Sequence, residues 1–96
     1  MARTVCVMLW ERVGRASDLA AYEDTVLALV AEHGGAVLSR VRSNGESGVP
    51  REVQVIRFPN AAAFDGYLND GRRLALAAQR DAAIERTDVF DVEQIV

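Results

Sequence analysis

Residues 4–10 read TVCVMLW, an apolar run whose β-branched and aromatic residues are typical of a strand. Side chains alternate between the two faces of a strand. The two faces of this run carry Val5, Val7 and Leu9 on one side and Cys6, Met8 and Trp10 on the other. Because both faces are apolar, both must be covered in the folded protein. The fold therefore depends on what covers the second face of this strand.

The length and composition predict one globular domain over residues 1–96. Half of the residues are hydrophobic, which excludes a disordered chain, and no apolar run is long enough to span a membrane. Cys6 is the single cysteine, so no internal disulfide forms, which fits a reducing compartment. The N-terminus enters a strand without the layout of a signal peptide, so a cytoplasmic protein with no membrane partner is expected.

The charges argue against a nucleic-acid partner. The net charge is −3, and all eleven basic residues are arginines. A protein that holds a phosphate backbone needs a basic field, which this composition does not supply. We therefore expect no nucleic acid among the partners of the chain.

The hydrophobic pattern predicts two helices and four strands in the order βαββαβ. The first helix has Ser17 as its expected N-cap and ends at Gly34-Gly35, and the second has Asn60 as its cap. The second helix is interrupted at Asp70-Gly71 and then resumes to about residue 86. The expected strands are 4–12, 36–43, 51–58 and 88–96. Two right-handed crossovers then give the α+β, ferredoxin-like arrangement, a four-stranded antiparallel sheet with both helices on one face.

This arrangement leaves one face of the sheet without a helix. A large exposed apolar face is unusual for a monomer, and two-fold dimers are the commonest oligomers. We therefore expect a homodimer that forms through this face of the sheet. The alternative is a central strand that merely exposes a few apolar residues.

Two stretches carry a resemblance to a known family, namely EHGGAVLSRVRS at 32–43 and EVQVIRFPNAAAFDGYLND at 52–70. With the strand order, they make the chain resemble the dimeric α/β-barrel superfamily, whose small members include antibiotic-biosynthesis monooxygenases and related domains of unknown function. The resemblance implies that two sheets pack face to face in a dimer and that a ligand lies between each sheet and its own helices. Haem-degrading relatives use an Asn, a Trp and a His at places where this chain has none, so haem degradation is not implied.

Three functional hypotheses follow from the resemblance. The first is a cofactor-independent, monooxygenase-like enzyme that acts on a small hydrophobic or aromatic metabolite. The alternative is a non-catalytic small-molecule-binding or accessory protein of the same fold, and the third is a purely structural dimer with a filled core. The chain has no phosphate loop and no dinucleotide fingerprint, so no cofactor is expected. One histidine and one cysteine cannot form a His/Cys metal site, so no metal is expected.

His33 and Asp81 are the candidate catalytic residues. His33 is a candidate general base, although in the last turn of the first helix an imidazolium also complements the helix dipole. Asp81 falls among apolar positions of the last helical segment, which predicts a carboxylate facing the sheet. Such a carboxylate needs a partner, for which Arg57 in the third strand is the expected residue. The pair is either an acid beside a ligand or a structural ion pair.

The candidate substrate-binding residues are Tyr22, Arg57 and Tyr67. The two tyrosines come from different helices and are expected to meet at the sheet, where they either present hydroxyls to a ligand or belong to the core. Arg73 and Arg80 are seven residues apart and therefore share a side of the helix. They either attract a carboxylate or phosphate at the mouth of a pocket or form a solvated helix face.

Overall fold

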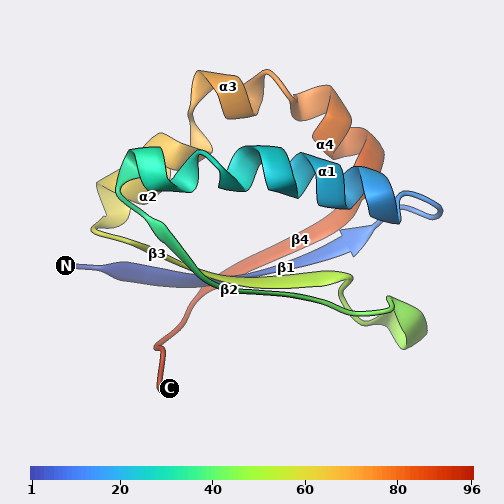
Figure 1. Cartoon of the computed structure of the whole chain (residues 1–96), viewed down its shortest axis with the longest axis horizontal. Coiled ribbons are helices and arrows are strands. Elements are labelled where there is room, and N and C mark those ends of the chain that lie inside the picture. Colours follow the sequence, from blue (N-terminus) through green and yellow to red (C-terminus); the bar gives the residue numbers. More distant parts are fainter.

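The strand that contains residues 4–10 is a central strand of a four-stranded sheet in the computed structural model, which describes residues 1–96 (Figure 1). The strands are β1 (Arg3–Glu11), β2 (Ala36–Arg42), β3 (Glu52–Phe58) and β4 (Ile84–Asp91). The helices are α1 (Ala16–Leu27), α2 (Ala61–Leu68), α3 (Gly71–Leu74) and α4 (Ala77–Ala83), with short 3₁₀ turns η1 (Val30–His33) and η2 (Glu46–Gly48).

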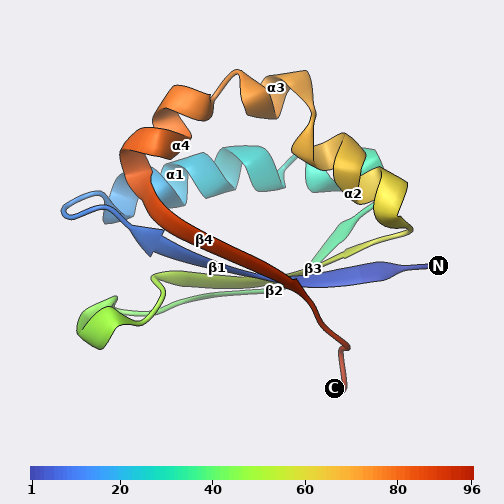
Figure 2. The same ribbon diagram turned by 180° about the vertical axis from the view of Figure 1, so that it is seen from behind.

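The sheet order is β2-β3-β1-β4, and every pairing is antiparallel. Figure 2 shows from behind that all four α-helices lie on one side of this sheet. The predicted ferredoxin-like arrangement is therefore confirmed. None of the helices combines the length and the apolar character that crossing a membrane requires.

Local residue chemistry determines where η1 ends and where α2 begins. Gly34 ends η1 with a φ of 75°, a left-handed conformation that glycine adopts without strain. The side chain of Asn60 accepts a hydrogen bond from the Ala63 amide at 2.8 Å, so the predicted cap of α2 is confirmed. Ser17 is not the cap of α1, because the helix begins at Ala16 and Arg15 occupies the cap position without a side-chain bond.

The boundary between the last helix and the last strand differs from the prediction. Ile84 pairs with Glu11 of β1 and is only 4% exposed, so residues expected to be helical already belong to β4. Burial against the sheet overrides the helix propensity of this stretch. The strand ends at Asp91, and residues 92–96 leave the sheet (Figure 2).

The core lies between the sheet and the helices. Val5, Ile56 and Phe58 from the sheet pack against Phe64 and Tyr67 of α2 in one cluster, with Phe58 fully buried. A second cluster joins the other ends of β1 and β4 to α1 and α4; its members are Leu9, Leu19, Tyr22, Val26, Ala83 and Ile84. These clusters hold the helices over one face of the sheet, and a space remains between the two clusters.

The other face of the sheet, which no helix covers, is also apolar. Here Cys6 and Met8 of β1 pair with Val55 and Val53 of β3. We call this surface the outer face, and its apolar side chains are Cys6, Met8, Trp10, Val41, Val53, Val55 and Phe90. Val41 is 57% exposed and Phe90 is 44% exposed. As predicted, no helix covers the second face of the first strand, although Cys6 is 8% exposed and Trp10 contacts Gly48 and Arg86 of the same chain.

A candidate small-molecule pocket between the sheet and the helices

The two core clusters leave a pocket between the inner face of the sheet and the helical layer. Its floor consists of apolar side chains from β1, β3, β4 and α2. Its polar lining residues are Glu23, Gln54, Tyr67, Arg73, Arg80 and Thr87. The cavity has a volume of about 50 Å³, whereas ligand pockets commonly span about 300–1,000 Å³. The cavity holds only a few atoms at this volume, so a larger ligand needs the lining side chains to move apart.

Glu23 is a carboxylic acid buried beside the pocket. It lies on α1 among the apolar positions and is 6% exposed. Burial raises the pKa of Glu23, while a hydrogen bond from Gln54 opposes this effect. The Nε2 atom of Gln54 donates to Glu23 Oε1 at 2.7 Å. A carboxyl group whose pKa is raised toward neutrality is suited to exchange a proton with a bound ligand.

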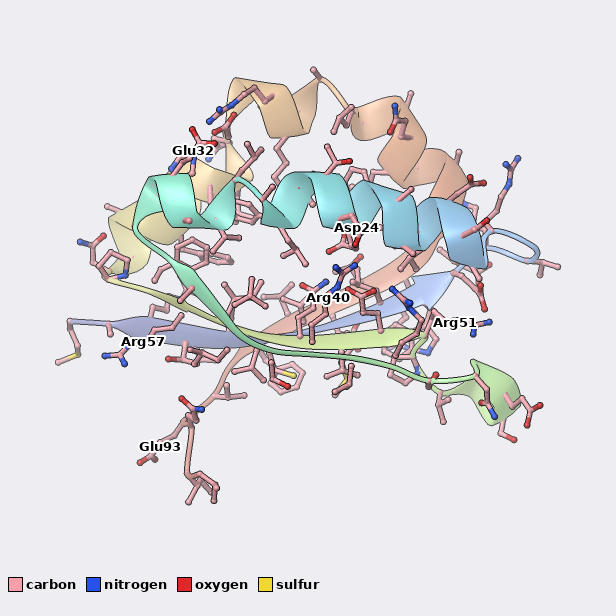
Figure 3. All side chains as sticks on the ribbon, in the orientation of Figure 1. Asp24, Glu32, Arg40, Arg51, Arg57 and Glu93 are labelled. Atoms are coloured by element: carbon pink, nitrogen blue, oxygen red, sulfur yellow. The ribbon has the colours of Figure 1, made fainter.

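Glu52 is a second buried carboxylate, and it has its own cation. It is fully buried and accepts from Arg40 Nε at 2.7 Å and from Arg40 Nη2 at 3.2 Å. Gln54 Nε2 also donates to Glu52 Oε2 at 2.7 Å, so one amide links the two carboxyl groups. Arg40 in turn reaches Asp24 on α1 at 2.6 Å (Figure 3). Glu52 is thus neutralised by a bonded cation, and Glu23 is not.

Arg73 extends from α3 over the pocket. Its Nη1 atom donates to the Leu68 carbonyl at 3.3 Å, and its guanidinium carbon lies 5.2 Å from the centre of the Tyr67 ring. Its Nε atom is buried and has no hydrogen-bond partner. Arg80 also lines the pocket, but it is engaged, because its Nη2 atom donates to Thr87 at 3.0 Å. Both arginines therefore lie at the pocket, as the first of the two sequence hypotheses expects.

The two tyrosines are both buried but have different surroundings. Tyr67 is 4% exposed and lines the pocket, whereas Tyr22 is 2% exposed and lies in the second core cluster. Burial raises the pKa of Tyr67 to about 12, against the effect of the nearby Arg73. Burial also raises the pKa of Tyr22. Tyr67 therefore remains a protonated hydroxyl at neutral pH and can donate to a ligand.

We predict that an alkaline titration followed by phenolate absorbance shows late ionisation of both tyrosines. The ordinary pKa of a tyrosine is about 10. Because the folded state holds these protons more tightly than the unfolded state, stability falls as the pH rises from that value toward 12. Tyr22→Phe and Tyr67→Phe assign the two transitions. Complete ionisation near the ordinary value, with the circular dichroism of the fold unchanged, would contradict the prediction.

The structure corrects the expected pair of Asp81 and Arg57. The Asp81 side chain is 75% exposed, and its nearest cation is Arg80 at 3.9 Å. The break between α3 and α4 turns Ala83 toward the core in place of Asp81. Arg57 is exposed on the opposite face of the sheet, because Ile56 and the other alternate residues of β3 point to the helices (Figure 3). The two side chains do not meet, and neither lines the pocket.

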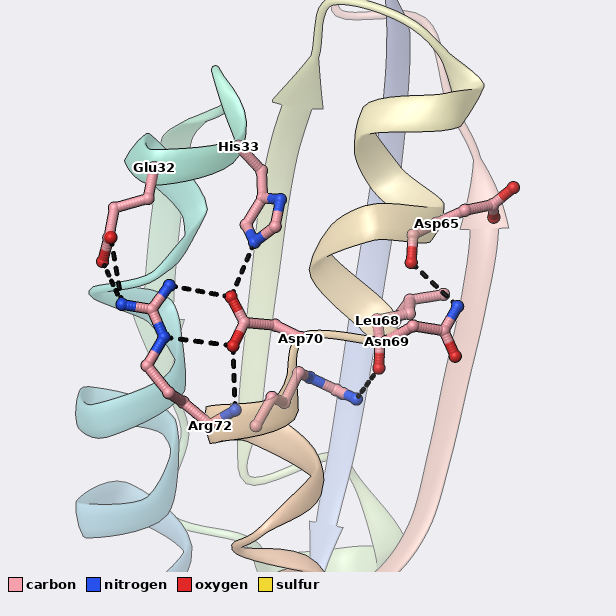
Figure 4. A network of polar contacts seen from close by, with 8 residues as sticks. Glu32, His33, Asp65, Leu68, Asn69, Asp70 and Arg72 are labelled. Atoms are coloured by element: carbon pink, nitrogen blue, oxygen red, sulfur yellow. Dashed lines mark hydrogen bonds and ion pairs between the residues drawn. The ribbon is translucent and has the colours of Figure 1, made fainter.

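His33 lies outside the pocket in a polar cluster that we call the clasp, which consists of Glu32, His33, Asp70 and Arg72 (Figure 4). His33 Nε2 lies 2.8 Å from Asp70 Oδ2, and Arg72 binds both Asp70 and Glu32. Hydrogen bonds from Arg72 and His33 hold the pKa of Asp70 well below its usual range. His33 lies in the last turn of η1, and the clasp joins this turn to the start of α3.

We predict that the clasp limits the motion of α3. This helix has no buried residue, so its position depends on polar contacts. Asp70→Ala removes the bonds to His33 and Arg72 and should speed hydrogen exchange at the amides of residues 74 and 75, which bond within α3. Asp65→Ala, an exposed aspartate on α2, is the matched control. Equal exchange in the two variants would show that the clasp does not hold α3.

The sequence hypotheses did not include Glu23, Gln54 and Glu52 among the site residues. A signal was present, because Glu23 lies four residues after Leu19 and three before Val26, within the apolar stripe of α1. Gln54 and Glu52 alternate with outward residues in β3 and so share the face of Ile56. The sequence pattern therefore indicates that these polar residues occupy buried positions of two facing elements, α1 and β3.

Comparisons with known proteins show the fold. No protein-family model matches the sequence, and no curated protein matches it. Among solved structures, the chain is similar to a dimeric protein of unknown function with a ferredoxin-like fold from Bacteroides fragilis (TM-score 0.72, 12% identity, covering 97% of this chain and 96% of that one). It is similar to a DABB family protein with a ferredoxin-like fold from Mesorhizobium loti (TM-score 0.70, 11% identity, 99% and 98% covered).

A third similar structure has a described activity. It is SnoaB, a cofactor-independent oxygenase from Streptomyces nogalater, with a TM-score of 0.71 and 14% identity over 99% of this chain and 96% of that one. At these identities the likeness concerns the fold. It confirms the fold expected from the resemblance to the dimeric α/β-barrel superfamily.

Proposed function

We propose that the chain is a small-molecule-binding protein whose ligand is a small hydrophobic or aromatic compound held between the sheet and the helices. The observation that carries the proposal is the largely apolar pocket lined by Arg73, a residue whose Nε–H group is buried and has no hydrogen-bond partner. A buried donor without an acceptor is unfavourable, and a ligand oxygen would satisfy it. Pockets that bind small molecules combine an apolar lining with a few placed polar groups in the same way.

The proposed binding protein is a homodimer that forms through the outer face. The support comes from the apolar side chains of this face, which leave Val41 and Phe90 exposed, and from the dimeric state of the similar protein from Bacteroides fragilis. In this dimer each chain keeps its own pocket, because the pocket lies on the opposite face of the sheet.

The second candidate function is cofactor-independent monooxygenation of the bound compound. Glu23 favours it, because a buried carboxylate at the pocket can take a proton from an acidic CH group of the substrate. In the balanced reaction a CH₂ group and O₂ give a C=O group and water, and the substrate supplies the electrons. The likeness to SnoaB supports this candidate only through the shared fold.

Binding is tested with indole, a neutral aromatic probe, by methyl NMR of the wild-type protein. We expect shifts at Val7, Leu68 and Val89, which line the pocket. Val89→Trp should fill the cavity and abolish them. Val37→Trp is the matched control, because Val37 lies on the inner face of the other edge strand and is also partly exposed. Shifts confined to other methyl groups, or binding that survives in Val89→Trp, would refute the proposal.

Turnover is tested separately with a carbon-acid substrate such as anthrone under isotopically labelled dioxygen. An oxygenase incorporates labelled oxygen into the product faster than the uncatalysed reaction does. Glu23→Gln should reduce the rate of incorporation to the uncatalysed rate while indole still binds. Incorporation no faster than without protein would leave the binding function and exclude oxygenation of this substrate.

A further inference from the structure

The pocket is positively charged although the protein as a whole is acidic. The net charge of the chain is −3. The charged residues of the pocket lining are Arg73, Arg80 and Glu23. Asp81 lies 3.9 Å from Arg80 but is 75% exposed, so water screens its charge. Within the lining, two guanidinium groups against one carboxyl group leave an excess of positive charge even when Glu23 is ionised. Glu52 adds no charge of its own, because Arg40 binds it with two hydrogen bonds.

The two arginines of the pocket differ in which of their N–H groups donate hydrogen bonds. Arg80 donates to Thr87, and Arg73 donates to the Leu68 carbonyl through Nη1. The Nε–H of Arg73 is buried and donates to nothing. A guanidinium group binds oxyanions better than neutral oxygens, because the hydrogen bond is then charge-assisted. The unpartnered donor and the excess positive charge therefore indicate the same kind of ligand group.

We propose that the ligand is a monoanion, an apolar body with one acidic oxygen group that accepts a hydrogen bond from Arg73 Nε. This inference rests on the proposed function and narrows its substrate class. The apolar body occupies the floor formed by side chains such as Val7 and Ile56. The acidic group is a carboxylate or an ionised enol, since both present an oxyanion to the guanidinium. Arg73 is thus the residue that selects for charge, and the apolar floor selects for shape.

The test compares matched pairs of probes by titration calorimetry. Benzoate and benzamide have nearly the same shape and differ in charge, and tropolonate and tropone form the corresponding enol pair. In the wild-type protein the anion of at least one pair should bind about tenfold or more tightly than its neutral partner. A preference only for benzoate identifies a carboxylate, and a preference only for tropolonate identifies an enol.

Arg73→Gln should reduce this preference to about unity while the neutral probes still bind. Arg15→Gln is the matched control, because Arg15 is a half-exposed arginine that pairs with Asp18 and lies outside both the pocket and the clasp. The preference should be unchanged in this control. A preference that persists in Arg73→Gln, or falls equally in Arg15→Gln, would overturn the role of Arg73.

A second measurement needs no variant. The ¹⁵N resonance of Arg73 Nε in the wild-type protein should shift with the preferred anion and not with its neutral partner. If neither anion binds more tightly than its neutral partner, the proposed binding function stands and the monoanion inference fails. If none of the probes, indole included, shifts the pocket signals, the proposed function fails as well.

Discussion

Arg40→Met should lower the free energy of unfolding by about 3–5 kcal/mol, because it leaves the charge of Glu52 buried without a cation. Glu52 is fully buried and receives two hydrogen bonds from Arg40. It also shares Gln54 with Glu23, so an uncompensated Glu52 would lie close to a second carboxyl group. Urea unfolding monitored by circular dichroism measures the change.

Arg42→Met is the control for this prediction. Arg42 lies on the same strand, but its side chain is 53% exposed and its Nη2 atom is 3.7 Å from Glu52. Because the Arg42 cation is half exposed and lies at the edge of ion-pair distance, it contributes about 0–1 kcal/mol, so this variant should unfold almost as the wild type does. Equal losses in the two variants would contradict the assignment of Arg40 as the cation that neutralises Glu52. The double variant Arg40→Met with Glu52→Met should recover most of the loss.

Val55→Glu should raise the dissociation constant of the dimer by at least about a thousandfold, or about 4 kcal/mol. Val55 pairs with Cys6 in the middle of the outer face, where a dimer would bury the new carboxylate without a partner. The single chain should remain folded, since this face is open to water in the monomer. Analytical ultracentrifugation across a concentration series measures the effect.

Leu74→Glu is the matched control for the dimer. Leu74 lies on α3, in the helical layer on the opposite side of the sheet, and is 53% exposed, so the same change should leave association unaffected. A Val55→Glu protein that associates as tightly as the wild type would show that the outer face is not the interface. The outer face would then need another cover.

The first three strands and the fold were predictable from the sequence because their signals are local. The run at residues 4–10, the glycines after η1 and the cap at Asn60 each determine their structure through neighbouring residues. The end of the last helix was not predictable in this way. Ile84 joins β4 because it pairs with Glu11, more than seventy residues away in the sequence, and this burial outweighs the local helix propensity.

The site was predictable only in part, since it depends on the rotation of each element. Tyr67, Arg73 and Arg80 all line the pocket, although Arg73 lies on α3 and Arg80 on α4 and not on one continuous helix. Asp81 was misplaced because the helical projection assumed one continuous helix, whereas the break before α4 changes which residues face the sheet. Arg57, the expected partner of Asp81, does not meet it, because the alternation of side chains in β3 directs Arg57 to the outer face.

The most direct test of the binding site is a crystal structure of the wild-type protein grown with 4-bromobenzoate, in which anomalous scattering locates the bromine. We expect the bromine on the apolar floor of the pocket, between β1 and α2, and the carboxylate within hydrogen-bond distance of Arg73 Nε. The account would be contradicted if 4-bromobenzoate bound at full occupancy only outside the space between the sheet and the helices and left the pocket empty.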